Sequence, residues 1–228
     1  MSLELFGYKS VKEKVDREKQ WVKNNFSDCP IHYDPEASWR ENAVVCRLSV
    51  LLPYCNYFGI YQILNQEFND ALAAEIIETG LSPVLAVGAG CGELAAVLEK
   101  RGIDIYAVDN SSESLPRNLT RSREQPLQTN YRSAIDKFKP ELIICSWMAE
   151  ESDWIKDFTL SGSVKACILI GEDNKRTDTD FAGWPSEVLK GSNKWSLCRL
   201  DHGVDFERPE LWWRHSKVVI FRNALVQG

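Results

Sequence analysis

The sequence predicts an α/β fold with a doubly wound, mostly parallel sheet, and one stretch, residues 83–110, carries most of this prediction. Residues 84–87 are a short apolar run bounded by proline and glycine, which is typical of a buried strand. Residues 93–100 place apolar side chains at helical spacing, and residues 105–109 are a second apolar run that ends in an aspartate. Two such strands joined through a helix form a βαβ unit, in which the strands are parallel.

The segment before this unit is predicted to be helical, because its apolar side chains recur at helical spacing. The predicted helices are residues 10–25, 35–52 and 66–78. We therefore divide the chain into an N-terminal helical cap, residues 1–80, and a core, residues 81–228. The aromatic side chains between residues 54 and 61 are either a lid over a ligand or packing groups that attach the cap to the sheet.

The turn inside the βαβ unit, residues 88–92, reads Gly-Ala-Gly-Cys-Gly. Glycine tolerates positive φ and lets a ligand approach the backbone closely. The turn opens a helix, whose first amide groups lack partners within the helix. Asp109 ends the next strand, where a carboxylate can accept hydrogen bonds from both hydroxyls of a ribose. A tight turn followed by an exposed aspartate is the simpler alternative, but the complete ordered set favours a ligand that contains a nucleoside.

The kind of nucleoside cofactor depends on small differences in this turn. The dinucleotide fingerprint requires glycine or alanine three residues after its second glycine, where this chain has Glu93. The pattern Gly-Ala-Gly-Cys-Gly instead resembles motif I of the class I S-adenosylmethionine-dependent methyltransferases, and Asp109 matches their ribose-binding acid. The resemblance extends from about residue 65 to residue 223. It implies a Rossmann-like fold, a seven-stranded mostly parallel sheet closed by an antiparallel C-terminal hairpin, and S-adenosylmethionine as cofactor.

The chain departs from this family at Ala86. Many of these enzymes have an acid there that helps to hold the methionine end of the cofactor. In this chain the methionine ammonium needs backbone carbonyl groups near Ala86 and Gly88, or a group from the N-terminal segment. The departure keeps a second hypothesis open, a methyltransferase-like binding subunit without activity. An NAD-dependent Rossmann enzyme is a third and weaker hypothesis, which Glu93 disfavours.

The resemblance implies cofactor-binding residues at four strand ends. They are Gly88, Ala89, Gly90 and Gly92 in the turn, Asp109 and Asn110 after the second strand, Asn130 and Tyr131 after the third, and Ser146 and Trp147 after the fourth. Asn130 either accepts a hydrogen bond from the adenine amino group or is an ordinary turn asparagine. Trp147 either forms a wall of the methyl-transfer site or packs in the core. The Ser-Trp-Met run at residues 146–148 differs from the Asn/Asp-Pro-Pro-aromatic run of enzymes that methylate amino groups.

The second half of the chain supplies the remaining strands. Predicted strands are residues 126–131, 141–145, 167–172, 195–200 and 216–222, of which the last two form the C-terminal hairpin. Methyl transfer from a sulfonium is an in-line displacement, so positioning supplies much of the catalysis and a general base is optional. His202 is a weak candidate for such a base. Its neighbour Asp201 points to the opposite face in a strand and need not orient it.

Composition limits the partners and the compartment. The net charge of −6 argues against a dedicated nucleic-acid binder, which would need clustered Lys and Arg. The chain has neither an apolar run of membrane-spanning length nor a signal-peptide core. Its seven cysteines include no Cys-x-x-Cys spacing, which predicts reduced thiols, no metal site and a cytoplasmic protein. The expected methyl acceptor is a small molecule or a protein side chain, with the small molecule favoured.

Overall fold

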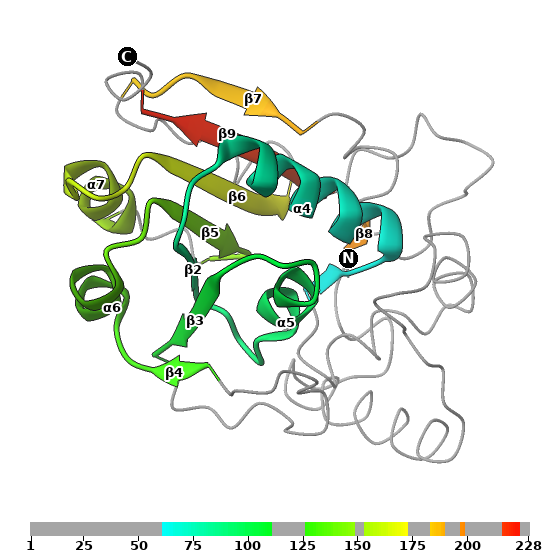
Figure 1. Ribbon diagram of the computed structural model, residues 1–228, viewed down its shortest axis with the longest axis horizontal. Coiled ribbons are helices and arrows are strands. Elements are labelled where there is room, and N and C mark those ends of the chain that lie inside the picture. The colour runs from blue at the N-terminus through cyan, green and yellow to red at the C-terminus, as the bar shows by residue number, and fades with distance from the viewer. Residues whose placement is uncertain are drawn as a thin grey trace, which may run out of the picture.

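The computed structural model describes residues 61–110, 126–148, 153–172, 183–189, 197–198 and 216–223. In this part of the chain, seven strands form one sheet in the order β4-β3-β2-β5-β6-β9-β7 (Figure 1). They are β2 Val84–Val87, β3 Ile105–Asp109, β4 Leu127–Gln128, β5 Leu142–Ser146, β6 Ala166–Glu172, β7 Ser186–Val188 and β9 Ser216–Arg222. The strands from β4 to β6 are parallel, whereas β9 is antiparallel to both of its neighbours. The predicted Rossmann-like fold class is confirmed.

One of the two predicted C-terminal strands pairs elsewhere. The antiparallel partner of β9 at the sheet edge is β7, and the prediction of residues 195–200 for this position is wrong. Within that range β8, Leu197–Cys198, pairs with β1, Gln62–Ile63, in a separate two-stranded sheet. The side chains of β7 are all exposed, so its sequence lacks the apolar alternation that indicates a strand. The composition of residues 195–200 predicts a strand but does not specify its partner.

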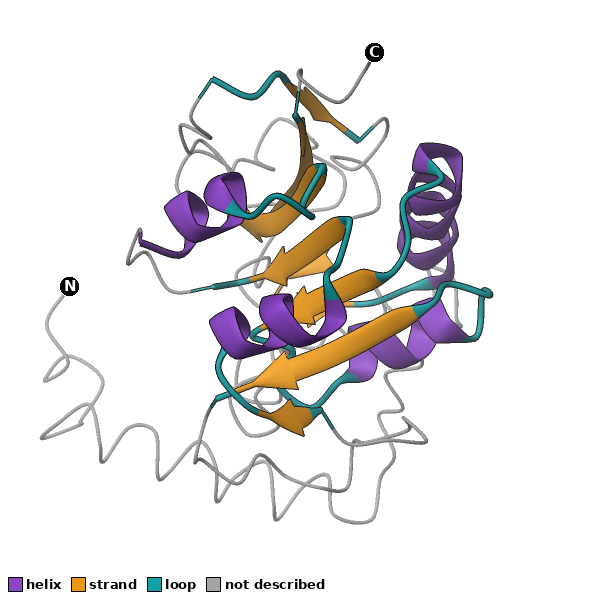
Figure 2. Cartoon of the chain, turned by 60° about the vertical axis from the view of Figure 1, so that its left-hand side comes forward, coloured by secondary structure: helices purple, strands orange, loops and turns teal. Residues whose placement is uncertain are grey.

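Helices cover both faces of the sheet (Figure 2). α4 (Gln66–Thr79) and α5 (Glu93–Glu99) pack on one face, and α6 (Tyr131–Phe138) and α7 (Asp153–Leu160) pack on the other. The predicted helix at residues 66–78 is confirmed by α4. Asn65 is the N-cap residue of α4. Its side chain accepts a hydrogen bond from the Phe68 backbone N–H at 2.9 Å.

Each face of the sheet has its own apolar core, because successive residues of a strand point to opposite faces. Leu142 and Ile144 of β5 belong to the core beneath α4 and α5. Ile143 and Cys145, which alternate with them, belong to the core beneath α6 and α7. Burial on both faces explains why the central strands read as continuous apolar runs. Each fully buried aliphatic side chain contributes about 1.5–3 kcal/mol, so the carboxyl ends of these strands are held firmly in place.

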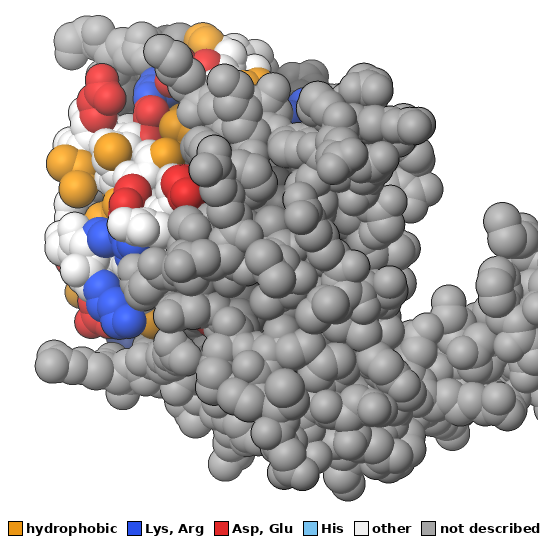
Figure 3. Space-filling view, turned by 90° about the vertical axis from the view of Figure 1, so that its right-hand side faces the viewer, with side chains coloured by type: hydrophobic (Ala, Val, Ile, Leu, Met, Phe, Trp, Pro, Cys, Tyr) orange, Lys and Arg blue, Asp and Glu red, His pale blue; other side chains and the backbone are white. Residues whose placement is uncertain are grey.

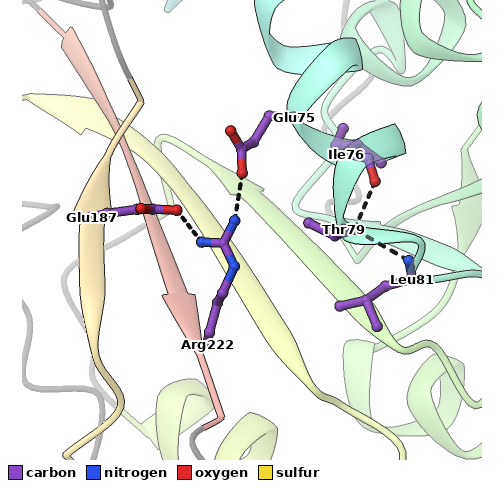
Figure 4. A network of polar contacts seen from close by, with 6 residues as sticks. All are labelled: Glu75, Ile76, Thr79, Leu81, Glu187 and Arg222. Carbon is purple, nitrogen blue, oxygen red and sulfur yellow. Dashed lines mark hydrogen bonds and ion pairs between the residues drawn. The ribbon is translucent and has the colours of Figure 1, made fainter. Parts of the chain in front are cut away.

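Arg222, the last residue of β9, connects the sheet edge to a helix. Its guanidinium donates hydrogen bonds to Glu187 of β7 and to Glu75 of α4 (Figure 4). The Arg222 and Glu75 side chains are only 28% and 16% exposed, so solvent screens this pair less than an ordinary surface ion pair. The same view shows Thr79 at the end of α4, where its hydroxyl bonds to backbone groups on both sides of the helix terminus.

Much of the N-terminal prediction lies outside the described residues, including the helices at residues 10–25 and 35–52 and residues 54–60 of the aromatic segment. The division of the chain at residue 80 therefore stays a prediction. Within residues 1–80, helix α4 packs against strands β2, β5 and β6 of the sheet. This helix, assigned to the cap from the sequence, thus forms part of the core of the α/β unit.

Candidate functional site

The glycine-rich turn lies at the carboxyl end of β2, between the carboxyl ends of β3 and β5. Gly88, Gly90 and Gly92 have φ of 64°, 57° and 81°, values that disfavour any residue with a Cβ. Ala89 donates its backbone N–H to the Val108 carbonyl of β3 at 3.0 Å, which ties the turn to the neighbouring strand. Ligands of open α/β sheets bind at such carboxyl ends, where the strand order reverses.

Asp109 holds the turn directly. Its Oδ2 accepts a hydrogen bond from the Gly90 backbone N–H at 2.7 Å, and the residue is half-buried. An ionised carboxylate has about four acceptor positions, so Asp109 retains acceptor capacity for ligand hydroxyls while it bonds to Gly90. The sequence predicted Asp109 as a ligand residue but did not predict this contact, because nothing local indicates that the end of β3 bonds to the turn after β2.

Two cavities meet at the glycine-rich turn, and both are lined by Val87 and Gly88. The larger, of about 450 Å³, is also lined by Val108, Asp109, Asn110, Thr129, Tyr131, Trp147, Met148 and Trp154. The smaller, of about 110 Å³, is also lined by Tyr61, Gln62, Leu64, Ala86, Ala89, Gly90, Cys91, Glu93, Leu94, Ala95, Ile144 and Ser146. An elongated ligand that fills both cavities would lie beside Gly88, where a Cβ would be only 2.7 Å from Sδ of Met148.

Eight of the ten predicted cofactor-binding residues line one or both cavities. They are Gly88, Ala89, Gly90, Asp109, Asn110, Tyr131, Ser146 and Trp147. Gly92 is the N-cap residue of α5, and a Cβ there would lie 2.9 Å from Cγ of Pro126. Asn130 is the N-cap residue of α6, and its Oδ1 accepts the Ser133 backbone N–H at 2.9 Å. The third strand, predicted at residues 126–131, is thus shorter in the structure, because helix α6 begins at Tyr131.

Trp147 has an unusual backbone conformation, with φ of 56°. Positive φ is a true outlier for a bulky residue and persists only where the surroundings enforce it. Its backbone N–H donates to the Ile170 carbonyl at 2.8 Å, and its indole Nε1–H donates to Oε1 of Gln62 at 3.1 Å. The Tyr61 ring lies beside the indole, with 6.0 Å between the ring centroids. Trp147 therefore lines the larger cavity and also anchors the β1 segment at the smaller one.

Several lining residues escaped sequence reasoning, among them Thr129, Trp154 and Gln62. Thr129 follows β4 and so could have been found by extending the strand-end argument. Trp154 and Gln62 come from α7 and β1, and only the folded chain brings them to the site. Cys91 lines the smaller cavity as well. Burial and the nearby Glu93 carboxylate raise the pKa of its thiol, so Cys91 is a neutral thiol and not a thiolate nucleophile at neutral pH.

Tyr131 is positioned by a contact between two helices. Its hydroxyl donates to Oδ2 of Asp157 on α7 at 2.5 Å, and Arg132 Nε donates to the same oxygen at 2.8 Å. The Tyr131 ring packs edge-on against Phe158, with 5.7 Å between the centroids. The hydrogen bond from Tyr131 and the charge of Arg132 lower the pKa of the Asp157 carboxyl. α7 thereby sets the position of an aromatic wall of the larger cavity.

Replacing Asp157 by alanine should destabilise the protein at pH 7 by about 1 kcal/mol, because Tyr131 loses its acceptor. The pKa of Asp157 in the folded protein lies below its ordinary value of 3.8. Its contribution to the free energy of unfolding is therefore complete above about pH 3.8. It is lost as the pH falls through the lowered pKa. Urea unfolding of both proteins between pH 7 and pH 3 measures the difference, which should shrink toward the acid end. A difference that grows as the pH falls would contradict this assignment.

The described residues contain no group of three His, Cys, Asp or Glu side chains close enough to hold a metal ion. The candidate base His202 and its neighbour Asp201 lie outside them. No helix in the described part of the chain has both the length and the apolar character needed to cross a membrane.

Comparisons with known proteins give matches in fold only. No family model and no curated protein sequence matches the chain. The methyltransferase domain of bacterial CtHen1 is 15% identical, with a TM-score of 0.46, over 69% of this chain and 98% of that domain. Magnesium protoporphyrin IX methyltransferase ChlM from Synechocystis PCC 6803, solved with bound S-adenosylmethionine, is 13% identical, with a TM-score of 0.41, over 90% of this chain and 97% of its own.

An S-adenosylmethionine-dependent methyltransferase from Archaeoglobus fulgidus is 12% identical, with a TM-score of 0.40, over 68% of this chain and 94% of its own. All three are solved structures of methyltransferases.

Proposed function

We propose that this protein binds S-adenosylmethionine and transfers its methyl group to an acceptor. The observation that carries the proposal is the pairing of Asp109 with the glycine-rich turn at the point where the two cavities meet. A carboxylate at the second strand end suits ribose hydroxyls, and a turn without side chains suits a ligand that lies against the backbone. The chemistry that this cofactor supplies is an electrophilic methyl group on a sulfonium.

The residues present fit the two ends of this cofactor. The larger cavity, which contains Asp109 and the Tyr131 ring, has the polar group and the aromatic wall that an adenosine requires. The smaller cavity begins on the other side of Gly88 and has the smaller volume that an amino-acid tail requires. In this arrangement Gly88 lies beside the sulfonium that joins the adenosine and the amino-acid tail, and the sulfonium carries the methyl group that is transferred. Trp147 and Met148 line the larger cavity and add apolar surface to its wall.

For the acceptor we propose a small molecule or a protein side chain, with the small molecule favoured. Nucleic-acid binding requires clustered Lys and Arg, whereas the chain has a net charge of −6. The described surface at the left edge of Figure 3 carries acidic and hydrophobic side chains as well as Lys and Arg. His202 stays a weak proposal for a base. We also propose a cytoplasmic location, which suits Cys145 and Cys167, both of them buried free thiols.

A second candidate function rests on Ala86. This residue lines the smaller cavity and offers only a methyl group where a charged cofactor end would lie. A chain that binds the cofactor weakly or without turnover would be a methyltransferase-like binding subunit. An NAD-dependent reaction is less well supported, because Glu93 begins α5 at a position where close helix–strand packing in dinucleotide-binding folds requires a small residue.

Isothermal titration calorimetry tests the cofactor assignment directly. S-adenosylhomocysteine, the product form of the cofactor, should bind in the micromolar range, which corresponds to about −8 kcal/mol. NAD should bind at least a hundredfold more weakly. Tight binding of NAD without any signal from S-adenosylhomocysteine would reject the assignment. Binding of S-adenosylmethionine without turnover across a broad panel of acceptors would favour the inactive subunit.

A further inference from the structure

The inference concerns the smaller cavity and rests on the proposed function. If the adenosine occupies the larger cavity beside Asp109, the amino-acid end of the cofactor enters the smaller one past Gly88. That end carries an ammonium group, which is a hydrogen-bond donor with three protons and no acceptor. Burying such a charge without oxygen partners is costly. Ala86, on the β2 side of the cavity, has no side-chain oxygen.

Gln62 lines the same cavity from the opposite segment, β1, and is only 7% exposed. Its Oε1 accepts the indole N–H of Trp147 at 3.1 Å. An indole N–H can only donate, so the amide oxygen of Gln62, and not its nitrogen, has to face Trp147. The Trp147 backbone is itself fixed by its hydrogen bond to Ile170. The orientation of the Gln62 amide is therefore set by a contact that spans 85 residues of sequence.

We infer that Gln62 binds the ammonium of the cofactor's amino-acid end through Oε1. An amide oxygen has two lone pairs, so it can accept from Trp147 and from an ammonium at the same time. The Glu93 carboxylate lines the same cavity and adds the negative charge that a neutral amide lacks. Gln62, oriented by Trp147, thus supplies from the N-terminal segment a side-chain acceptor that Ala86 does not provide.

The test compares two ligands that differ only at this end. S-adenosylhomocysteine has the amino-acid tail, whereas 5′-methylthioadenosine has the same nucleoside and sulfur but no tail. Gln62→Leu should weaken S-adenosylhomocysteine binding by about tenfold or more, since a hydrogen bond to a charged group is lost. The affinity for 5′-methylthioadenosine should change by less than about twofold, because this ligand has no ammonium to bond to Gln62. Calorimetry on the full chain measures both.

Gln62→Glu is the matched variant, because a carboxylate keeps the acceptor for Trp147 and adds a charge. It should preserve or increase the preference for S-adenosylhomocysteine over 5′-methylthioadenosine, and a reduced preference would overturn the inference. Equal losses for both ligands in Gln62→Leu, or no loss, would overturn it as well. So would a selective loss found only in Glu93→Gln, since the ammonium would then belong to that carboxylate. Failure of the unaltered protein to bind either ligand would instead reject the proposed function, and the inference with it.

Discussion

Replacing Asp109 by alanine should weaken S-adenosylhomocysteine binding by about 1.5–3 kcal/mol, roughly ten- to a hundredfold, because hydrogen bonds from ribose hydroxyls to a charged acceptor are lost. The structure adds a second effect. Oδ2 of Asp109 also accepts the Gly90 backbone N–H at 2.7 Å, so the substitution frees the glycine-rich turn. Stability should fall by about 1 kcal/mol, which lowers the melting temperature by about 2–4 °C in a protein of this size.

Asp104 provides the control for this substitution. Asp104 precedes β3, whereas Asp109 ends it, and its carboxylate accepts a hydrogen bond from the Ser82 hydroxyl at 3.5 Å in an exposed contact. Asp104→Ala should therefore leave the affinity for S-adenosylhomocysteine unchanged. Thermal melts of both variants with and without this ligand separate the two effects. If Asp109→Ala keeps the full ligand-induced shift in melting temperature, Asp109 does not contact the ligand.

Replacing Gly92 by alanine should have the largest effect on stability, a loss of about 2–5 kcal/mol. Two costs add. A residue with a Cβ pays about 1–2 kcal/mol for the left-handed conformation that Gly92 adopts, with φ of 81°. The new Cβ would also lie 2.9 Å from Cγ and 3.1 Å from Cδ of Pro126. The proline ring is rigid, so this overlap forces a backbone shift that costs about 1–3 kcal/mol more.

Gly102→Ala carries only the first of these costs, so the difference between the two variants gives the second. Gly102 has nearly the same backbone conformation, with φ of 84°, but a Cβ there would meet no atom within 4 Å. This variant should lose only about 1–2 kcal/mol. Urea unfolding measures both variants, and equal losses would show that Pro126 moves aside at no cost. Because Pro126 leads into β4, whose Gln128 pairs with Asp109, Gly92→Ala should weaken S-adenosylhomocysteine binding as well.

The parts of the site that depend on neighbouring residues in the chain were predictable. Residues 84–87, 93–99 and 105–109 form the predicted strand, helix and strand. The positive φ of Gly88, Gly90 and Gly92 agrees with a turn that only glycine makes easily. The end of β5 was also predictable, because a buried parallel strand is one continuous apolar run and this run ends at the polar residue Ser146.

The parts that depend on distant residues were not predictable. β7, Ser186–Val188, is an edge strand through its backbone bonds to β9, and its exposed side chains leave no pattern in the sequence. Residues 195–200 were predicted to be a strand, but the pairing of Leu197–Cys198 with β1 depends on where the chain returns in space. An edge strand is selected by the neighbour that its backbone meets, which apolar periodicity does not encode.

The sequence by itself determined that this protein has a βαβ unit, a glycine-rich turn and an acid at the end of β3, because backbone preference and apolar periodicity act between near neighbours. Only the tertiary structure decided that Asp109 bonds to Gly90, that α7 positions Tyr131 and that Trp147 orients Gln62. Each of these contacts joins residues far apart in the sequence. Such contacts form where packing of the two cores brings strand ends and helices together, and their geometry follows from that packing.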